Sequence, residues 1–238
     1  MEKTCEQALE IGLPAIAFTD HADFVTVHAD QHRLDISGYM DEIERCRSKY
    51  KGLRILSGVE LGEPHWFPDE TRDVLSACKL DRVLGSMHCA RIGDRVVDAS
   101  QVSKLDDVDA SAFARAFFAE TLAMLRSGVA FETLAHIDYP KRYVTEYREE
   151  DFEEELRAIL TEAARRDVVL EVNTTRGHVM CPSVTVLGWW RDAGGRAVSF
   201  GSDAHEPSKI AAGFEAAALM VEAAGFKPAA EPTALWHR

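Results

Sequence analysis

Short runs rich in β-branched and aromatic residues alternate along this chain with longer stretches of helical periodicity. The strand-like runs lie at residues 16–18, 54–59, 82–85, 133–135, 168–172 and 197–200. The clearest helical stretches are residues 39–50, 112–125 and 151–165, with apolar residues on one side and charged residues on the other. This alternation is typical of repeated βα units around a parallel sheet. The chain has 238 residues, an ordinary length for one α/β barrel, so we expect a single domain over residues 1–238.

The first strand of such a barrel has no counterpart here. Residues 2–13 already read as an amphipathic helix, with Cys5, Ala8 and Leu9 toward one side, and this helix leads into the run at 16–18. Six parallel strands alone would leave an unpaired edge, which proteins usually cover or avoid. At the other end, residues 227–238 with two prolines predict an irregular tail.

The charge balance restricts the possible partners. The chain carries 27 basic and 40 acidic residues, a net charge of −13, and has no basic run of the length expected for a nucleic-acid patch. Long nucleic acid is therefore an unexpected partner, whereas a small anionic substrate fits if bound metal ions reverse the local field. The five scattered cysteines suggest no disulfide framework, and no apolar run could serve as a leader or membrane span. We expect a cytoplasmic protein without membrane contact; nothing indicates its oligomeric state.

Residues able to bind metal follow five of the six strand-like runs. They are His21, Glu60, His88, His136, and Asp203 with His205. The carboxyl ends of strands in a β/α barrel meet on one face, so these distant residues should converge there. A mixed set of imidazoles and carboxylates suits divalent ions such as Zn, Mn or Fe. The sequence thus predicts a metal site at that face.

Each of these residues has an alternative structural interpretation. A single histidine after an apolar strand is more often a hydrogen-bonded structural residue than a ligand. The corresponding alternative for the whole set is a solvated polar rim. Burying so many titratable groups at one pole without a metal would be costly, which favours the metal site.

The order of these motifs resembles the polymerase-and-histidinol-phosphatase (PHP) superfamily over nearly the whole chain. The matching motifs are Ala17-Phe18-Thr19-Asp20-His21, Gly58-Val59-Glu60, Gly85-Ser86-Met87-His88, Leu134-Ala135-His136-Ile137-Asp138 and Gly201-Ser202-Asp203-Ala204-His205. The stretches at 141–143 and 171–174 are most similar to the histidinol-phosphatase branch. The resemblance implies an α/β fold, a distorted (β/α)7 barrel of PHP type, with two to three metal ions.

The resemblance also implies roles for individual residues. Glu60 would bridge two metals, His88 and His136 would complete the second metal's shell, Asp203 would ligate the first, and His21 and His205 would hold the third. Glu60, Asp203 and His205 are the expected catalytic residues. One feature departs from the family: its first strand carries a His-x-His pair, which occurs nowhere in this sequence. Either that strand lies upstream of Met1, which we favour, or the protein lacks it and holds its first metal poorly.

The implied reaction is hydrolysis of a small phosphomonoester by a metal-activated water, and the resemblance makes histidinol phosphate the first candidate substrate. Arg142 and Arg176 are candidate phosphate-binding residues because a guanidinium pairs bidentately with phosphate oxygens; a surface arginine or helix-cap ion pair is the alternative for each. Asp20 could orient His21 or cap a turn. Two rival functions remain: a phosphodiesterase or exonuclease acting on short nucleic acids or nucleotides, and a non-catalytic PHP-type binding module with a degraded first metal site.

Overall fold

The computed structural model describes residues 1–25, 34–175 and 180–238. Its main sheet contains β1 (Ala15–Ala22), β2 (Arg54–Gly62), β3 (Arg82–Ser86), β6 (Thr133–Leu134), β7 (Val169–Asn173), β8 (Ala197–Gly201) and β9 (Trp236–His237), in that order across the sheet. The first six strands are parallel, and β9 pairs antiparallel with β8. All six predicted strands are therefore present. The tail was predicted to be irregular, which is wrong for residues 236–237, because their backbone pairs with the start of β8.

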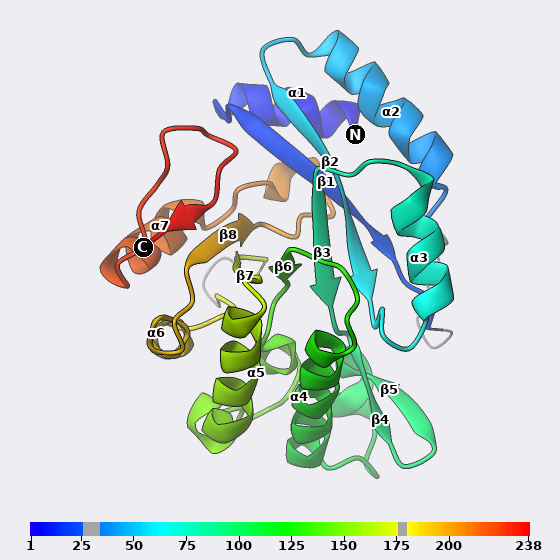
Figure 1. Cartoon of the computed structure of the whole chain (residues 1–238), viewed down its shortest axis with the longest axis vertical. Coiled ribbons are helices and arrows are strands. Elements are labelled where there is room, and N and C mark those ends of the chain that lie inside the picture. Colours follow the sequence, from blue (N-terminus) through cyan, green and yellow to red (C-terminus); the bar gives the residue numbers. More distant parts are fainter. Residues whose placement is uncertain (26–33, 176–179) are drawn as a thin grey trace.

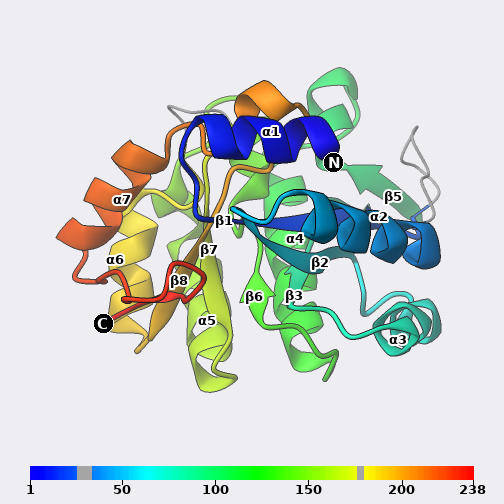
Figure 2. The same ribbon diagram turned by 90° about the horizontal axis from the view of Figure 1, so that it is seen from above.

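Helices surround the curled sheet (Figure 2). They are α1 (Glu2–Glu10), α2 (Ile36–Lys49), α3 (Pro68–Ala77), α4 (Ala110–Arg126), α5 (Glu153–Arg165), α6 (Val184–Asp192) and α7 (Phe214–Ala223). Short 3₁₀ helices are η1 (Ala99–Lys104), η2 (Tyr139–Arg142), η3 (Glu149–Phe152) and η4 (Pro207–Lys209). Side chains of Asp35, Asp109 and Ser183 accept backbone N–H groups at the starts of α2, α4 and α6, which satisfies donors that lack helical partners.

A small hairpin extends one end of the sheet. It consists of β4 (Cys89–Ile92) and β5 (Arg95–Asp98), which pair antiparallel directly after His88 (Figure 1). The sequence analysis did not find this hairpin. The first helix is also shorter than predicted: it ends at Glu10, and Gly12 then adopts a φ of +77°, a left-handed conformation that glycine accommodates and a continuing helix does not.

The described residues form one large hydrophobic core and two smaller ones. The large core joins α4, α5, α6 and α7 to β6, β7 and β8, with Phe113, Phe117 and Trp190 among its fully buried side chains. One smaller core joins α1 and α2 and contains Cys5 and Ile43. The other lies between β1 and β2 and contains Ala22, Val59 and Leu61. Among helices of the described residues, none has both the length and the apolar character needed to cross a bilayer.

The curled sheet does not close into a barrel. Within the described residues, β1 pairs only with β2, and β9 covers β8 only at Ala197 and Val198. Between β1 and the carboxyl half of β8 lies a cavity of about 1210 Å³, whose apolar lining includes Ile16, Phe18 and Phe200. The gap expected beside the first observed strand is therefore present, and the architecture is a half-barrel with one open side.

Candidate metal centre

The strand register aligns the carboxyl ends of β1, β2 and β3. His21 on β1 lies directly opposite Glu60 on β2, and Ser86, two residues before His88, lies opposite Gly62. On the other side of the sheet, Asn173 at the end of β7 lies opposite Gly201 at the end of β8. Parallel pairing thus brings residues that are far apart in the sequence to the same end of the half-barrel, as the barrel geometry predicts.

Glu60 lies at the centre of this end of the sheet. Its Oε1 is 3.2 Å from Nε2 of His88 and 3.0 Å from Nε2 of His136. All three side chains are at least nine-tenths buried. Two imidazole nitrogens and a carboxylate oxygen therefore point at one another in a space shielded from solvent, and each of them is a common zinc ligand.

His21 and His205 extend this cluster toward the cavity. The His21 ring lies 5.5 Å from the His88 ring and 5.7 Å from the His205 ring, between centroids. Ligand atoms of His21, Glu60 and His88 all lie within 4.8 Å of one another, close enough to hold one ion together. His205 is different, because its side chain is 72% exposed and its Nδ1 lies 3.0 Å from the backbone oxygen of Asp203.

Asp203 occupies the opposite wall of the site. Its Oδ2 accepts a hydrogen bond of 3.0 Å from Nη1 of Arg142, whose Nη2 donates to Oδ1 of Asn173 over 2.7 Å. The Arg142 side chain is only 6% exposed and its guanidinium lies 4.8 Å from the centre of the Tyr139 ring. Arg142 is thus a buried arginine inside the site rather than a surface residue. Arg176, the other candidate phosphate-binding residue, lies outside the described residues.

Several residues of the site have unusual backbone conformations. His136 has a φ of +22°, Asp203 of +48° and Glu63 of +44°. Positive φ is uncommon outside glycine and costs free energy, so it persists only where the surrounding structure enforces it. Such strain concentrates at functional sites, and here it turns the chain sharply just after β2, β6 and β8.

Glu171, a buried carboxylate in the middle of β7, was not among the predicted site residues. Its Oε2 accepts the backbone N–H of His136 over 2.9 Å and the side-chain amide of Asn173 over 3.1 Å. Burial, together with the negative charges of Glu60 and Asp203, raises the pKa of Glu171. A signal existed, because Glu171 and Asn173 are two residues apart and so share one face of an otherwise apolar strand.

Two other carboxylates near the site also went unnoticed. Asp23 lies 3.2 Å from Nδ1 of His21, and Glu63 accepts the backbone N–H groups of His88 and Cys89 at 2.5 and 2.8 Å. Asp20 had been the candidate to orient His21 or to cap a turn. The capping role is wrong because Asp20 lies within β1, and the partner of His21 is Asp23.

The charges of the cluster depend strongly on one another. The negative charge of Glu60 raises the pKa of His21 to about 9. Burial opposes charge on His88, but its hydrogen bond with Glu60 and the charges of Asp23 and Glu63 raise its pKa to about 10. Burial alone would raise the pKa of Glu60, yet His21, His136 and His88 hold it well below its usual value. Without metal, the cluster therefore holds protons where cations would otherwise bind.

These residues fit a divalent metal. The donor set is of the mixed imidazole and carboxylate type that zinc and related ions prefer. Glu60 has two ring nitrogens on one oxygen, an arrangement in which a cation can replace the protons between them. A second group of possible ligands, Asp23, Glu63 and His88, lies beside the first.

Residues 1–175 match the PHP domain family. The chain belongs to the PHP domain family. This confirms the resemblance inferred from the order of the strand-end motifs.

Two proteins described as histidinol-phosphatase or probable histidinol-phosphatase are similar to the chain over most of its length. A probable histidinol-phosphatase of Clostridium acetobutylicum is 28% identical over 236 residues, covering 94% of this chain and 88% of the relative. The histidinol-phosphatase of Lactococcus lactis is 26% identical, covering 94% and 85%. A crystal structure of histidinol phosphate phosphatase from Lactococcus lactis with zinc, L-histidinol and phosphate superposes with a TM-score of 0.83 at 23% identity, covering 94% and 87% of the two chains. The expected PHP-type fold is thereby confirmed.

Proposed function

We propose that this protein is a metal-dependent phosphatase that hydrolyses histidinol phosphate. The observation that carries the proposal is the convergence of His88 and His136 on Glu60 in a buried site at the carboxyl ends of the strands. Similarity to two histidinol-phosphatases over 94% of the chain supports the choice of substrate. The zinc, histidinol and phosphate of the similar crystal structure support the metal requirement.

The residues that would hold the metals are those of the strand ends. His88, His136 and Glu60 would form the most buried position, His21 and His205 a second, and Asp203 would contribute with Glu60 to a third. We propose Glu60 as the shared ligand because His88, His136 and His21 all lie close to it. Zinc, manganese and iron all fit the donor chemistry.

Bound divalent ions would lower the pKa of a water molecule and neutralise the charge of the phosphoryl group. The chain's own residues would bind and orient the substrate. Arg142 lies inside the site with its guanidinium toward Asp203, where it could pair with phosphate oxygens. Buried Glu171 supplies a carboxylate on the same wall of the cavity, which suits a substrate with a positively charged amino group.

The experiment is a phosphate-release assay with the purified chain loaded with zinc or manganese. L-histidinol phosphate would be compared with other small phosphomonoesters and with a phosphodiester of a nitrophenol. We expect L-histidinol phosphate to give the highest kcat/KM, and removal of metal by a chelator to abolish release. A preference for the diester would instead support the rival phosphodiesterase function.

A second candidate is a non-catalytic binding module, and one observation favours it. The side of the half-barrel between β1 and β8 is open, so the wall that contains Asp203 faces a cavity rather than another strand. Asp203 would then share its metal with Glu60 alone. If the metal-loaded chain binds L-histidinol phosphate but releases no phosphate, this second function is the better description.

A further inference from the structure

Asp23 lies between two of the candidate metal-binding histidines. Its Oδ2 is 3.2 Å from Nδ1 of His21, and its Oδ1 is 3.8 Å from Nδ1 of His88. Both contacts involve the ring nitrogen Nδ1, whereas His88 directs Nε2 at Glu60. One carboxylate thus faces the back of two imidazoles, one on β1 and one between β3 and β4.

We propose that Asp23 positions His21 and His88 together, through their Nδ1 atoms, so that Nε2 of each ring faces the metal. A metal-binding imidazole usually donates its other N–H to a carboxylate or carbonyl, which fixes the tautomer and the ring orientation. Here a single carboxylate would do this for two rings at once. The inference rests on the proposed metal centre and adds to it a residue that binds no metal itself.

The backbone of β2 is adapted to this carboxylate. A Cβ atom added at Gly62 would lie 1.8 Å from Oδ1 of Asp23 and 3.5 Å from Nδ1 of His88. Any side chain at Gly62 would therefore displace Asp23 from the two rings. The Asp23 side chain is 17% exposed, so solvent competes little for its oxygens.

The His88 backbone is held independently of its ring. Glu63 accepts the N–H groups of His88 and Cys89, and the Glu63 side chain is fully buried. With the main chain fixed in this way, the remaining freedom of His88 is rotation of its ring. Asp23 acts on that freedom, which is why we assign it an orienting role rather than a general structural one.

The test is a zinc titration of the full chain in competition with a chromophoric chelator, with Asp23→Ala and Asp23→Asn variants. We expect Asp23→Ala to weaken zinc binding by about 10- to 100-fold, the usual cost of losing a carboxylate behind a metal-binding histidine. Asp23→Asn has the same shape, but its amide offers an acceptor oxygen to only one ring. It should therefore fall between the wild type and Asp23→Ala.

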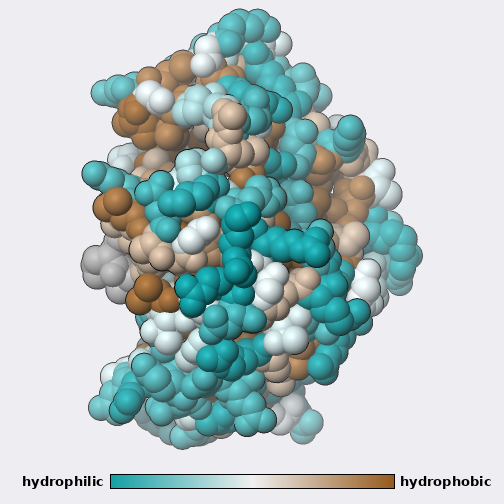
Figure 3. Space-filling model, turned by 60° about the vertical axis from the view of Figure 1, so that its left-hand side comes forward, coloured by the Kyte–Doolittle hydropathy of each residue, from teal (hydrophilic) through white to brown (hydrophobic). Residues whose placement is uncertain are grey.

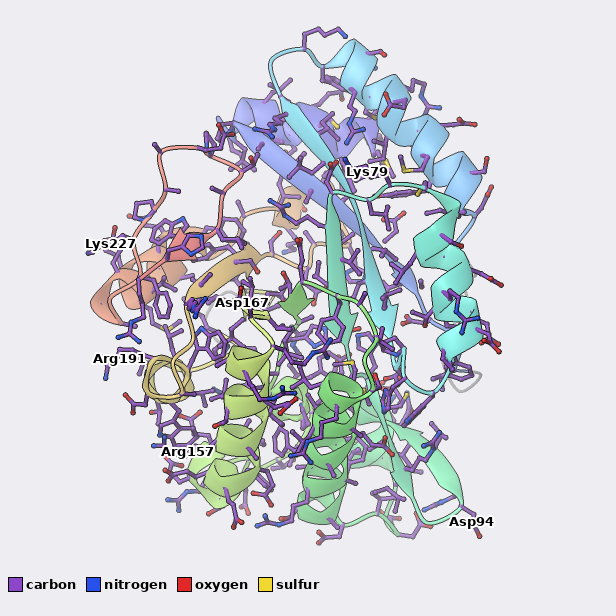
Figure 4. All side chains as sticks on the ribbon, viewed as in Figure 1. Lys79, Asp94, Arg157, Asp167, Arg191 and Lys227 are labelled. Carbon is purple, nitrogen blue, oxygen red and sulfur yellow. The ribbon has the colours of Figure 1, made fainter. Side chains whose placement is uncertain are left out.

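Two control variants separate position from charge. Asp20→Asn removes an exposed carboxylate next to His21 in the sequence, and Asp94→Asn removes one at the tip of the β4–β5 hairpin, far from the sheet (Figure 4). Both should bind zinc as the wild type does. Thermal unfolding of the metal-free proteins, measured in parallel, should give similar midpoints for the wild type and both controls, and a cooperative transition shows that each Asp23 variant is folded.

Several results would overturn the proposal. Unchanged zinc affinity in Asp23→Ala would do so, as would an equal loss in Asp20→Asn. Loss of one bound zinc with unchanged affinity for the others would show that Asp23 is itself a ligand, as the adjacent group of Asp23, Glu63 and His88 would permit. If the wild type bound no zinc, both proposals would fail. A chain that binds zinc but releases no phosphate would refute only the proposed phosphatase function.

Discussion

Arg142 donates a hydrogen bond to Asp203 across the site, with 3.0 Å between Nη1 and Oδ2. The residue proposed to bind phosphate is thus paired with a residue proposed to bind metal. Both side chains are largely buried, and Asn173 fixes the other branch of the guanidinium. Occupation of the metal site and availability of Arg142 for phosphate are therefore coupled through one carboxylate.

Replacing Arg142 by Gln should weaken phosphate binding, and it should change zinc binding only at the Asp203 position, because Arg142 pairs with that carboxylate. A hydrogen bond to a charged group contributes about 1.5–3 kcal/mol, so KM or the inhibition constant of inorganic phosphate should rise about 10- to 100-fold. Lysine should rescue this only in part, because it lacks the planar pair of donors. Inhibition by phosphate, measured beside a zinc titration, checks the prediction. Equal phosphate inhibition in wild type and variant would refute the assignment.

Glu60→Gln should lower turnover by orders of magnitude and reduce the metal occupancy. One oxygen of Glu60 faces two imidazole nitrogens, and a neutral amide is a poor ligand for two cations. Metal analysis of the purified variant, together with its phosphate-release rate, tests this. The matched control is Glu132→Gln, which changes a carboxylate at the opposite end of the sheet, just before β6. Full metal content with normal turnover in Glu60→Gln would contradict the shared-ligand role.

Zinc binding should release protons near neutral pH. The pKa of His21 is raised to about 9 and that of His88 to about 10 in the metal-free protein, so both rings are protonated at pH 7. Metal binding needs their neutral form, so affinity should rise with pH up to about 9–10 and fall as pH decreases. For each proton released, the zinc affinity should increase about tenfold for every unit by which the pH rises. Calorimetry in buffers of different ionisation enthalpy counts the released protons. If no proton were released, the raised pKa values of His21 and His88 would be refuted.

The metal positions should differ in affinity. The position at His88, His136 and Glu60 is the most buried and has three ligands, whereas Asp203 faces the open cavity and shares only Glu60. Stepwise removal of zinc with a chelator should therefore empty the Asp203 position first. Three zinc ions leaving together, with one affinity, would contradict this order.

The strands were predictable because each combines a short β-rich run with a polar residue at its carboxyl end. The pattern gave β1, β2, β3, β6, β7 and β8, and the helices α2, α4 and α5. The hairpin of β4 and β5 was missed because Arg91, Asp94 and Arg95 give this stretch the composition of a charged loop. The pairing of β9 was missed because it depends on where the tail meets β8, which is a tertiary contact.

The residues of the candidate site were predictable where they follow a strand. They were not predictable where they support another side chain of the site. His21, Glu60, His88 and His136 stand directly at strand ends, and the structure brings them together. Asp23 lies beyond its strand and is recognised only by its distances to two rings. Asp20 was a plausible partner from adjacency alone, but neighbouring residues of a strand point to opposite faces.

Among the described residues β1 pairs only with β2, and its other side bears on how the protein behaves at high concentration. A strand with free backbone donors and acceptors is a template for pairing with another molecule, and nature often protects such strands with charge. Here protection comes from exposed Asp20 within β1 and from the net charge of −13. Hydrophobic and hydrophilic residues are intermixed on the face of the molecule that Figure 3 shows. Salt shortens the range of repulsion between charges to about 8 Å at physiological ionic strength. Raising the salt concentration should therefore promote self-association through β1. The solubility of the protein should be lowest in concentrated, salt-rich solutions such as those used for crystallisation.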